Sequence, residues 1–269
     1  MSNQSEAPTP ALRPRILAIS NQKGGVGKTT TAVNLATAMA AVDRKVLVID
    51  LDPQGNASTS LGIDQKRRVI NTYHLLTGEA TIAQAAVPTA VPNLFVVPSG
   101  VDLAGGELEL VDVENRHARL RDALVNNAGF DFILIDCPPS LGLLTLNALV
   151  AADAVMVPLQ AEFLALEGIS HLVRTIERVR KGFNPRLEIQ GIVLTMVDKR
   201  NNLSEMVEND VRGYFGAKVY NTVIPRNVRI SEAPSHGKPI LLYDFGSKGA
   251  QAYLNLAGEV LKREQAVAA

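Results

Sequence analysis

Residues 21–31 read Asn-Gln-Lys-Gly-Gly-Val-Gly-Lys-Thr-Thr-Thr, and this stretch decides the fold. It follows a short apolar run at 16–19 and leads into a helical pattern that includes Val33, Leu35 and Met39. A glycine-rich turn between a strand and a helix lets backbone N–H groups face a polyphosphate, and the helix N-terminus adds the positive end of its dipole. The stretch therefore predicts a nucleotide phosphate site.

Within this stretch, Lys28 and Thr29 have the side chains that a bound polyphosphate needs. The Lys28 ammonium supplies a mobile charge for the β- and γ-phosphates, and the Thr29 hydroxyl is suited to ligate Mg²⁺. The ordinary pattern G-x-x-x-x-G-K-[ST] would place its first glycine at position 22, but Gln22 stands there and a second lysine, Lys23, follows it. Lys23 is either a solvated loop lysine or a second cation at the mouth of the phosphate loop.

The composition describes a chain with a substantial apolar core and no global charge. Hydrophobic residues make up 46% of the 269 residues, and 27 basic residues balance 27 acidic ones. Without a net field, any DNA binding has to come from local basic patches. The single cysteine, Cys137, excludes an internal disulfide framework and a cysteine-rich metal site.

Two observations argue against secretion and against a membrane span. Residues 1–14 are polar and proline-rich, without the apolar segment of a secretory signal. The apolar region 148–166 does not read as a membrane span, because it is interrupted by Asp153, Pro158, Gln160 and Glu162. We therefore expect a soluble, cytoplasmic protein.

Strands and helices are predicted to alternate along the chain. The strands are continuous apolar runs, typical of a sheet covered on both faces, and lie at 15–20, 45–50, 93–97, 132–136, 154–158, 188–195 and 218–224. Helical patterns lie at 115–127, 164–181, 204–214 and 247–263. This alternation predicts an α/β fold, a single-domain, doubly wound, mostly parallel sheet flanked by helices. We expect a disordered N-terminal tail at 1–14, a P-loop ATPase domain at 15–264 and a C-terminal tail at 265–269.

Two acidic segments follow predicted strands, at the edge of the sheet where ligands gather in such folds. Residues 50–56 read Asp-Leu-Asp-Pro-Gln-Gly-Asn, and Asp52-Pro53 alone would also suit a turn. In 132–136, four hydrophobic residues precede Asp136, a pattern typical of a Walker B strand whose carboxylate holds Mg²⁺ through water. Cys137 has no evident histidine partner, and we interpret it as a packed small residue rather than a nucleophile.

Three motifs together resemble the ParA/Soj-type chromosome-partitioning ATPases, which belong to the ParA/MinD class with a deviant Walker A motif. They are K-G-G-V-G-K-T-T at 23–30, D-x-D-P-Q-G-N at 50–56, and I-P-R-N-V-R at 224–229 followed by E-A-P-S-H-G-K-P at 232–239. The resemblance extends from residue 16 to about residue 261. It implies a P-loop fold that binds ATP as substrate with Mg²⁺.

The resemblance also assigns roles to individual residues. It implies that Lys23 reaches across a dimer interface to the partner's phosphates, that Lys28 binds phosphate, and that Asp52 orients the attacking water. It implies a metal site at Thr29, Asp50 and Asp136. The nucleotide-binding set that it implies is Lys23, Gly24, Gly25, Val26, Gly27, Lys28, Thr29 and Thr30, with Pro225 and Asn227 bordering the adenine.

The same resemblance predicts contacts to nonspecific double-stranded DNA. Its leading contacts are Arg200 and Arg229, followed by Arg226, Lys199 and Lys248. Taken alone, these residues are better explained as solvated loop charges. Contacts of this kind reach phosphates rather than bases, so that binding is expected to be independent of sequence and to weaken steeply with salt.

The function expected from the resemblance is an ATP-driven DNA-segregation switch in the nucleoid. ATP joins two copies of the chain, the dimer binds DNA, and a ParB-type centromere-binding protein stimulates hydrolysis and release. The first alternative is a membrane-associated positioning ATPase of the MinD type, although the C-terminal residues lack the bulky apolar face that membrane binding needs. The second is a metabolic ligase similar to dethiobiotin synthase. Whether the replicon is a chromosome or a plasmid stays open.

Overall fold

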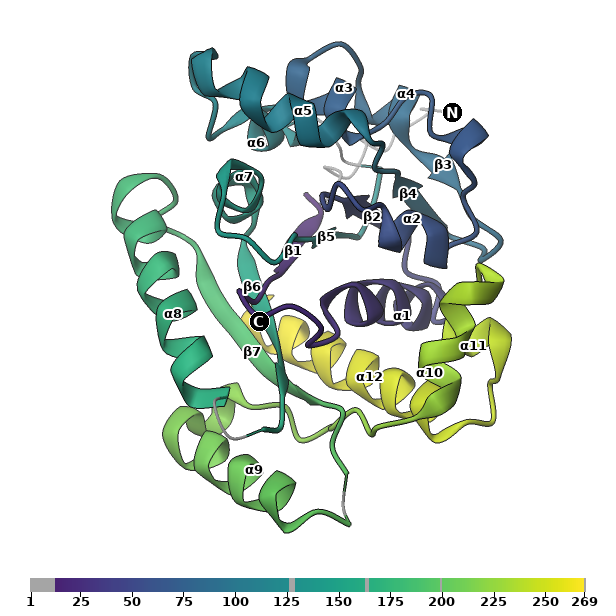
Figure 1. Ribbon diagram of the computed structural model, residues 1–269, viewed down its shortest axis with the longest axis vertical. Helices are drawn as coiled ribbons and strands as arrows, with labels where there is room; N and C mark the ends of the chain where they lie inside the picture. The colour runs from purple at the N-terminus through teal and green to yellow at the C-terminus, as the bar shows by residue number, and fades with distance from the viewer. Residues whose placement is uncertain (1–12, 126–128, 163–164, 199, 269) are drawn as a thin grey trace, which may run out of the picture.

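A seven-stranded sheet lies at the centre of the computed structural model, which describes residues 13–125, 129–162, 165–198 and 200–268 (Figure 1). Its strand order is β3-β4-β2-β5-β1-β6-β7, and every pairing is parallel except that of β3 with β4. The strands are β1 (Arg15–Ile19), β2 (Val46–Asp50), β3 (Val87–Pro88), β4 (Leu94–Val97), β5 (Phe132–Asp136), β6 (Ala154–Gln160) and β7 (Glu188–Thr195). The predicted doubly wound, mostly parallel sheet is confirmed.

Helices cover both faces of this sheet (Figure 1). One face is covered by α1 (Lys28–Ala40) and α12 (Lys248–Ala268), and the other by α7 (Leu143–Ala151) and α8 (Ala165–Gly182). The remaining helices are α2 (Asn56–Ser60), α3 (Thr72–Thr77), α4 (Ile82–Ala85), α5 (Asp102–Glu109), α6 (Arg119–Leu124), α9 (Asn202–Phe215), α10 (Val228–Glu232) and α11 (Ile240–Tyr243).

Strand β1 shows why the apolar runs are continuous. Successive side chains of a strand point to opposite faces, and here both faces are buried. Leu17 and Ile19 pack in the core shared with α1 and α12, while Ile16 and Ala18 pack in the core on the α7 side. Because β1 lies between β5 and β6, its carboxyl end faces the crevice in which such sheets bind ligands.

The strand predicted at 218–224 is wrong. A short 3-10 turn at Gly216–Lys218 is followed by an extended segment with isolated bridges from Val219 to Ile192 and from Pro225 to Val197. The N–H groups of Asn221 and Thr222 donate to the Glu259 carboxylate of α12, at 2.9 and 3.0 Å, and not to a neighbouring strand. Tyr220 N–H and Ile224 N–H still donate to the Ile192 and Leu194 carbonyls of β7, at 2.9 and 2.8 Å. The Glu259 side chain, which is distant in sequence, therefore interrupts the ladder that the apolar pattern suggested.

The predicted tails at the two ends of the chain agree with the structure only in part. Helix α12 continues to Ala268 through part of the segment 265–269 that was expected as a tail. Glutamate, glutamine and alanine favour helix, which accounts for the extension. Of the predicted tail at 1–14, residues 1–12 lie outside the described residues, and Arg13 forms an ion pair with Asp153.

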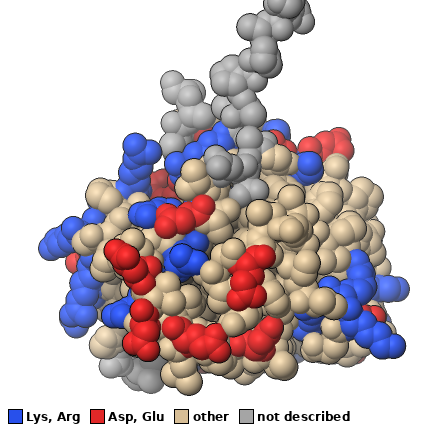
Figure 2. All heavy atoms as spheres, turned by 90° about the horizontal axis from the view of Figure 1, so that it is seen from above, with Lys and Arg blue, Asp and Glu red and all other residues tan. Residues whose placement is uncertain are grey.

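Charge is distributed unevenly over the neutral chain. Figure 2 shows the face at the top of Figure 1, where α3, α5 and α6 lie, with acidic side chains in an arc and with Lys and Arg both within this arc and toward the edges. The segment 102–114 contains five acidic residues and no basic one.

Across the part of the chain that the structure describes, no helix is long and apolar enough to cross a bilayer.

Candidate nucleotide site and basic groove

The turn between β1 and α1 has the shape of a phosphate-binding loop. Gly25 and Gly27 adopt φ of 73° and 86°, in the left-handed region where a side chain is strained, and Gly27 caps α1. Val26 is buried, and its carbonyl accepts a 2.9 Å hydrogen bond from the Thr195 hydroxyl on β7. The glycines and this anchor from β7 together fix the loop at the N-terminus of α1.

The two lysines of the loop lie in different environments. Lys28 is buried, and its ammonium donates a 3.0 Å hydrogen bond to the Lys23 carbonyl. Burial lowers the pKa of Lys28, while the Asp136 carboxylate opposes that shift. The half-exposed Lys23 forms an ion pair with Glu162. Lys28 therefore lies inside the loop, whereas Lys23 lies at its rim.

Asp50 and Asp136 lie side by side at the ends of adjacent strands, where they are partners in the β2–β5 register. Both Asp50 oxygens accept hydrogen bonds, one from Asp52 N–H at 3.3 Å and the other from Ser58 N–H at 2.7 Å and Ser58 hydroxyl at 2.6 Å. Burial raises the pKa of Asp50 to about 6 despite these bonds. Asp50 is thus already occupied by protein donors.

Asp136 differs from Asp50 in having unused oxygens. It is fully buried, and among the described residues no hydrogen bond of normal geometry reaches either carboxylate oxygen, although the Thr29 hydroxyl and the Lys28 ammonium lie close enough to favour its charged form. Burial, followed by the negative charge of Asp50, raises the pKa of Asp136 well above its ordinary value. A buried carboxylate without donors is costly unless a cation meets it, so the Asp136 oxygens fit a divalent metal better than those of Asp50 do.

Asp52 lies at the opening of this acidic cluster. Its Oδ1 accepts a 3.0 Å hydrogen bond from Gln54 N–H, which fixes the turn that the Asp-Pro sequence favours. Its side chain lines a cavity of about 330 Å³ together with Gly24, Gly25, Gly27, Lys28, Thr29, Thr30, Gln54, Asn56, Pro139 and Met196. The structure thus brings the predicted phosphate loop and Asp52 around one space.

A second cavity, of about 270 Å³, adjoins the first. The two share Gly27, Thr30 and Met196. The second is also lined by Thr195, Ile224, Pro225, Arg226, Asn227, Ile230, Ser231, Pro234 and Tyr253. Pro225 and Asn227, expected beside the adenine, both line this mainly apolar space, and Asn227 also caps α10 by accepting from Arg229 N–H at 2.9 Å.

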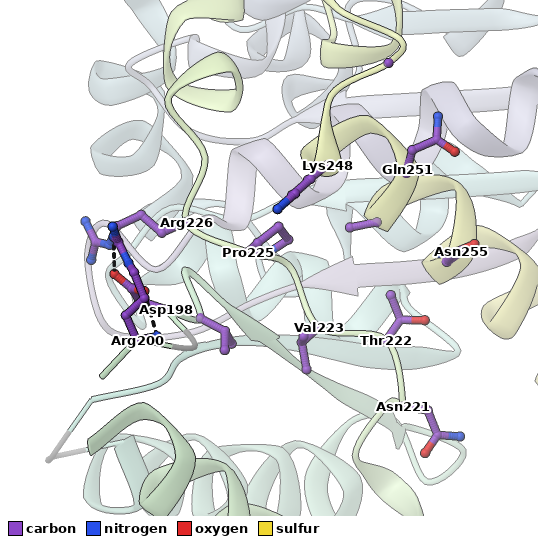
Figure 3. A pocket seen from close by; sticks show the side chains of 13 residues that line it. Asp198, Arg200, Asn221, Thr222, Val223, Pro225, Arg226, Lys248, Gln251 and Asn255 are labelled. Atoms are coloured by element: carbon purple, nitrogen blue, oxygen red, sulfur yellow. Dashed lines mark hydrogen bonds and ion pairs between the residues drawn. The ribbon is translucent and has the colours of Figure 1, made fainter. Parts of the chain in front are cut away.

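The predicted DNA-contacting residues are only partly brought together. A groove of about 1010 Å³ is lined by Arg200, Arg226 and Lys248. Asp198 lies beside Arg200, on the side of the groove opposite Lys248 (Figure 3). Arg200 pairs with Asp198 at 2.8 Å and lowers the pKa of that carboxyl to about 2. The other lining residues are Val197, Asn221, Thr222, Val223, Pro225, Gly246, Gln251, Ala252 and Asn255.

Arg229 and Lys199 are not among the groove residues. Arg229 pairs with Glu232 at 2.9 Å and with Asp244 at 3.5 Å, so two carboxylates already compete for its guanidinium. Lys199 lies outside the described residues. Lys248, which ranked lowest by sequence, stands across the groove from Arg200 (Figure 3).

Several residues of the site were missed by the sequence analysis. Ser58 binds Asp50, Thr195 anchors the phosphate loop, and Met196 lies between the two cavities with a φ of 53°. No local pattern marks Thr195 or Met196, because they reach the site only through the pairing of β7 with β6. Ser58 follows Asp50 by eight residues and lies in the short helix α2, and no local pattern marks it as a partner of that carboxylate.

Comparison with known proteins agrees with this geometry. A family model described as an AAA domain matches residues 14–189. The chain is 61% identical to the chromosome partitioning protein ParA of Caulobacter vibrioides over 93% of this chain and 95% of that protein. It is 53% identical to the sporulation initiation inhibitor protein Soj of Bacillus subtilis, covering 91% and 98%.

A solved structure shares the fold closely. Cobyrinic acid a,c-diamide synthase from Mycobacterium smegmatis, with bound ATP analog and magnesium, superposes with a TM-score of 0.82 at 38% identity. The match covers 94% of this chain and 96% of that one.

Proposed function

The chain belongs to the ParA/Soj family of chromosome-partitioning proteins, and from that premise we propose that it is an ATP-driven switch for DNA segregation. The observation that carries the proposal is the pair of adjoining cavities. One is lined by the phosphate loop and Asp52, and the other by Pro225 and apolar side chains. Their order along the crevice matches the order of triphosphate and base in ATP.

ATP binding uses groups that are already in place. The triphosphate lies in the first cavity, where the loop N–H groups and the N-terminus of α1 favour an anion. The Lys28 ammonium exchanges its hydrogen bond to the Lys23 carbonyl for phosphate oxygens. Thr29 and Asp136 would hold Mg²⁺, which would neutralise part of the negative charge of the bound triphosphate.

Hydrolysis needs one well-placed base beside the γ-phosphate. Asp52 lines the phosphate cavity, and we assign it the role of orienting the attacking water and accepting its proton. Its bond from Gln54 N–H uses one carboxylate oxygen and leaves the second to face a water. Phosphoryl transfer depends mainly on such positioning, so the rate follows the placement of Asp52.

Dimerisation through Lys23 couples the phosphate to assembly. In the single chain the Lys23 ammonium pairs with Glu162, so reaching a partner's phosphates requires this pair to open. A triphosphate offers a stronger counter-charge than one carboxylate, and loss of the γ-phosphate weakens the bridge. Whether the two chains stay together therefore depends on the γ-phosphoryl group.

DNA binding is proposed for the groove at Arg200, Arg226 and Lys248. Pro225 and Arg226 line both this groove and the base cavity, so nucleotide and DNA meet the same segment of chain. Two copies of the groove in a dimer double the number of basic groups. A ParB-type protein is the proposed partner that accelerates hydrolysis and release.

The structure offers an argument against the membrane-binding alternative. The apolar face of α12 is packed against α1 in the core, where Tyr253, Leu256 and Val260 are buried. An amphipathic anchor would need that face free. Among the described residues of α12, no second apolar face is available.

The test is ATP turnover measured with nonspecific DNA and the cognate ParB-type protein, without any small-molecule acceptor. We expect DNA and partner together to accelerate phosphate release, and Lys28→Ala to abolish it. Turnover that requires an organic acid acceptor would favour the metabolic alternative. ATP-dependent sedimentation with anionic liposomes would favour the membrane alternative.

A further inference from the structure

Arg68 is a buried arginine whose guanidinium binds mainly the segment that follows Asp52 and also binds Ser99 after β4. Its side chain is 6% exposed. Nε and Nη2 donate to the Ile63 carbonyl at 3.1 and 2.7 Å, and Nη2 also donates to the Thr59 hydroxyl at 2.8 Å. Nη1 donates to the Gly55 and Ser99 carbonyls at 3.3 and 3.4 Å. Four positions of the chain are therefore joined by one side chain.

Among the described residues, the charge of Arg68 has no direct counter-ion. None of the ion pairs among the described residues includes it, and its partners are carbonyl and hydroxyl oxygens. Burial lowers the pKa of Arg68, and the negative charges of Asp50 and Asp64 oppose the shift. Burying a cation that is held only by dipoles costs free energy. In return, the planar guanidinium donates hydrogen bonds to several positions of the chain at once, which a neutral side chain would not do.

The first connection runs from Arg68 to Asp52. Gly55 N–H donates to the Asp52 carbonyl at 2.9 Å, which closes the turn that carries the Asp52 side chain. Gly55 has a φ of 65°, and a Cβ added there would lie 2.4 Å from Arg68 Nη1. The guanidinium thus packs directly against the backbone three residues after Asp52.

The second connection runs from Arg68 to Asp50 through α2. Thr59, which accepts from Arg68, is adjacent to Ser58, and Ser58 binds the Asp50 carboxylate through N–H and hydroxyl. Ser99 N–H donates to the Ser58 hydroxyl at 3.0 Å, and the Ser99 carbonyl accepts from Arg68. The arginine therefore braces the segment that follows Asp52, at Gly55 and at Thr59 next to the serine that binds Asp50.

We propose that Arg68 is a positioning residue for hydrolysis, which holds residues 52–60 so that the Asp52 carboxylate faces the γ-phosphate. The proposal rests on the proposed ATPase function. Arg68 lines neither cavity, so it acts on the turn and not on bound nucleotide. Its loss should reduce kcat while leaving the KM for ATP nearly unchanged.

The test compares Arg68→Ala and Arg68→Lys with a matched control. Arg119→Ala removes another carbonyl-binding arginine, which donates to the Leu76 and Thr77 carbonyls at 2.8 and 2.7 Å away from the nucleotide cavities. We expect Arg68→Ala to lower kcat by about tenfold to 100-fold, as a displacement of about 1 Å can. KM should change by less than about twofold, since the phosphate loop that sets ATP affinity is untouched. Guanidinium ion at millimolar concentration should restore part of the rate.

Arg68→Lys keeps the charge but loses the planar fork, so an intermediate rate is expected. It also provides the readout if the alanine variant does not fold. An unchanged kcat in either folded variant, or an equal loss in Arg119→Ala, overturns the proposal. Hydrogen exchange of residues 52–60 without nucleotide is the second readout. It should accelerate in Arg68→Ala and not in Arg119→Ala.

The two readouts separate this proposal from the function on which it rests. If the wild-type chain does not hydrolyse ATP, the proposed function fails, while the exchange experiment still decides whether Arg68 orders the turn. If the wild type is active and kcat falls without faster exchange, the positioning role is refuted and the ATPase function stands.

Discussion

Replacing Asp136 by asparagine should stabilise the nucleotide-free protein. The Asp136 carboxylate is fully buried, and among the described residues no hydrogen bond of normal geometry reaches its oxygens. The nearby Thr29 hydroxyl and Lys28 ammonium offset only part of the effect of burial, because the pKa of Asp136 still lies well above its ordinary value. A buried charge of this kind costs several kcal/mol, whereas a neutral amide without partners costs about 1–3 kcal/mol. Asp136→Asn therefore relieves about 2 kcal/mol at neutral pH. For a chain of this length that corresponds to a rise in Tm of about 4–8 °C.

The gain from Asp136→Asn should depend on pH with a definite sign. Burial and the charge of Asp50 raise the pKa of Asp136 above that of an unfolded aspartate, about 3.9. The native state then binds more protons than the unfolded state, so this contribution to stability is complete below about pH 4 and is lost as pH rises through the native pKa. The asparagine side chain does not titrate, so the free energy of unfolding of the variant relative to wild type should grow with pH.

Nucleotide with Mg²⁺ should reverse the order of stability. At 100 times its Kd a ligand adds about 2.7 kcal/mol to the wild type, and the variant should gain little of the Mg²⁺-dependent part. The assay is thermal unfolding at pH 5, 6.5 and 8, with and without ATP analogue and Mg²⁺. Asp122→Asn, at an exposed carboxylate beside Arg121, is the control and should shift unfolding by less than about 0.5 kcal/mol. A variant less stable than wild type at every pH, or equally stabilised by Mg²⁺ and nucleotide, would refute the reasoning.

Three further predictions concern the loop, the turn and the groove. Lys28→Ala should abolish ATP binding in calorimetry, because the loop loses the ammonium that meets the phosphates; unchanged affinity contradicts the phosphate site. Gly55→Ala should destabilise the fold by about 1–3 kcal/mol in urea unfolding, because φ is 65° and Arg68 blocks a Cβ. Arg226→Glu should weaken DNA binding at low salt and reduce its salt dependence, whereas Arg174→Glu on α8 should not; equal losses refute the groove.

The phosphate loop and the central strands could be predicted because their signals are local. Glycines at fixed spacing before a lysine, and buried strands such as 132–136 and 188–195, are specified by adjacent residues, and the latter two match the structure to the residue. The five-residue helices α2 and α10 have too few residues to show a periodic pattern, and α4, which has four, also escaped notice.

The parts of the site that escaped prediction depend on long-range contacts. The extended segment after Lys218 is held by Glu259, about 40 positions later, and Arg68 acquires its role only when Ser99 and Gly55 fold against it. Likewise, the pairing of Lys23 with Glu162 cannot be read from either residue alone. Local sequence patterns predict the structure of adjacent residues, whereas these contacts form between segments that only the order of strands in the sheet brings together.

Molar mass in solution tests the switch most directly. Wild type and Lys23→Ala would be measured by size-exclusion chromatography with light scattering, each with a non-hydrolysable ATP analogue and with ADP, both with Mg²⁺. The account predicts twice the 28.8 kDa of one chain only for wild type with the analogue. A wild-type protein that stays single with the analogue, or pairs equally well with ADP, would contradict it.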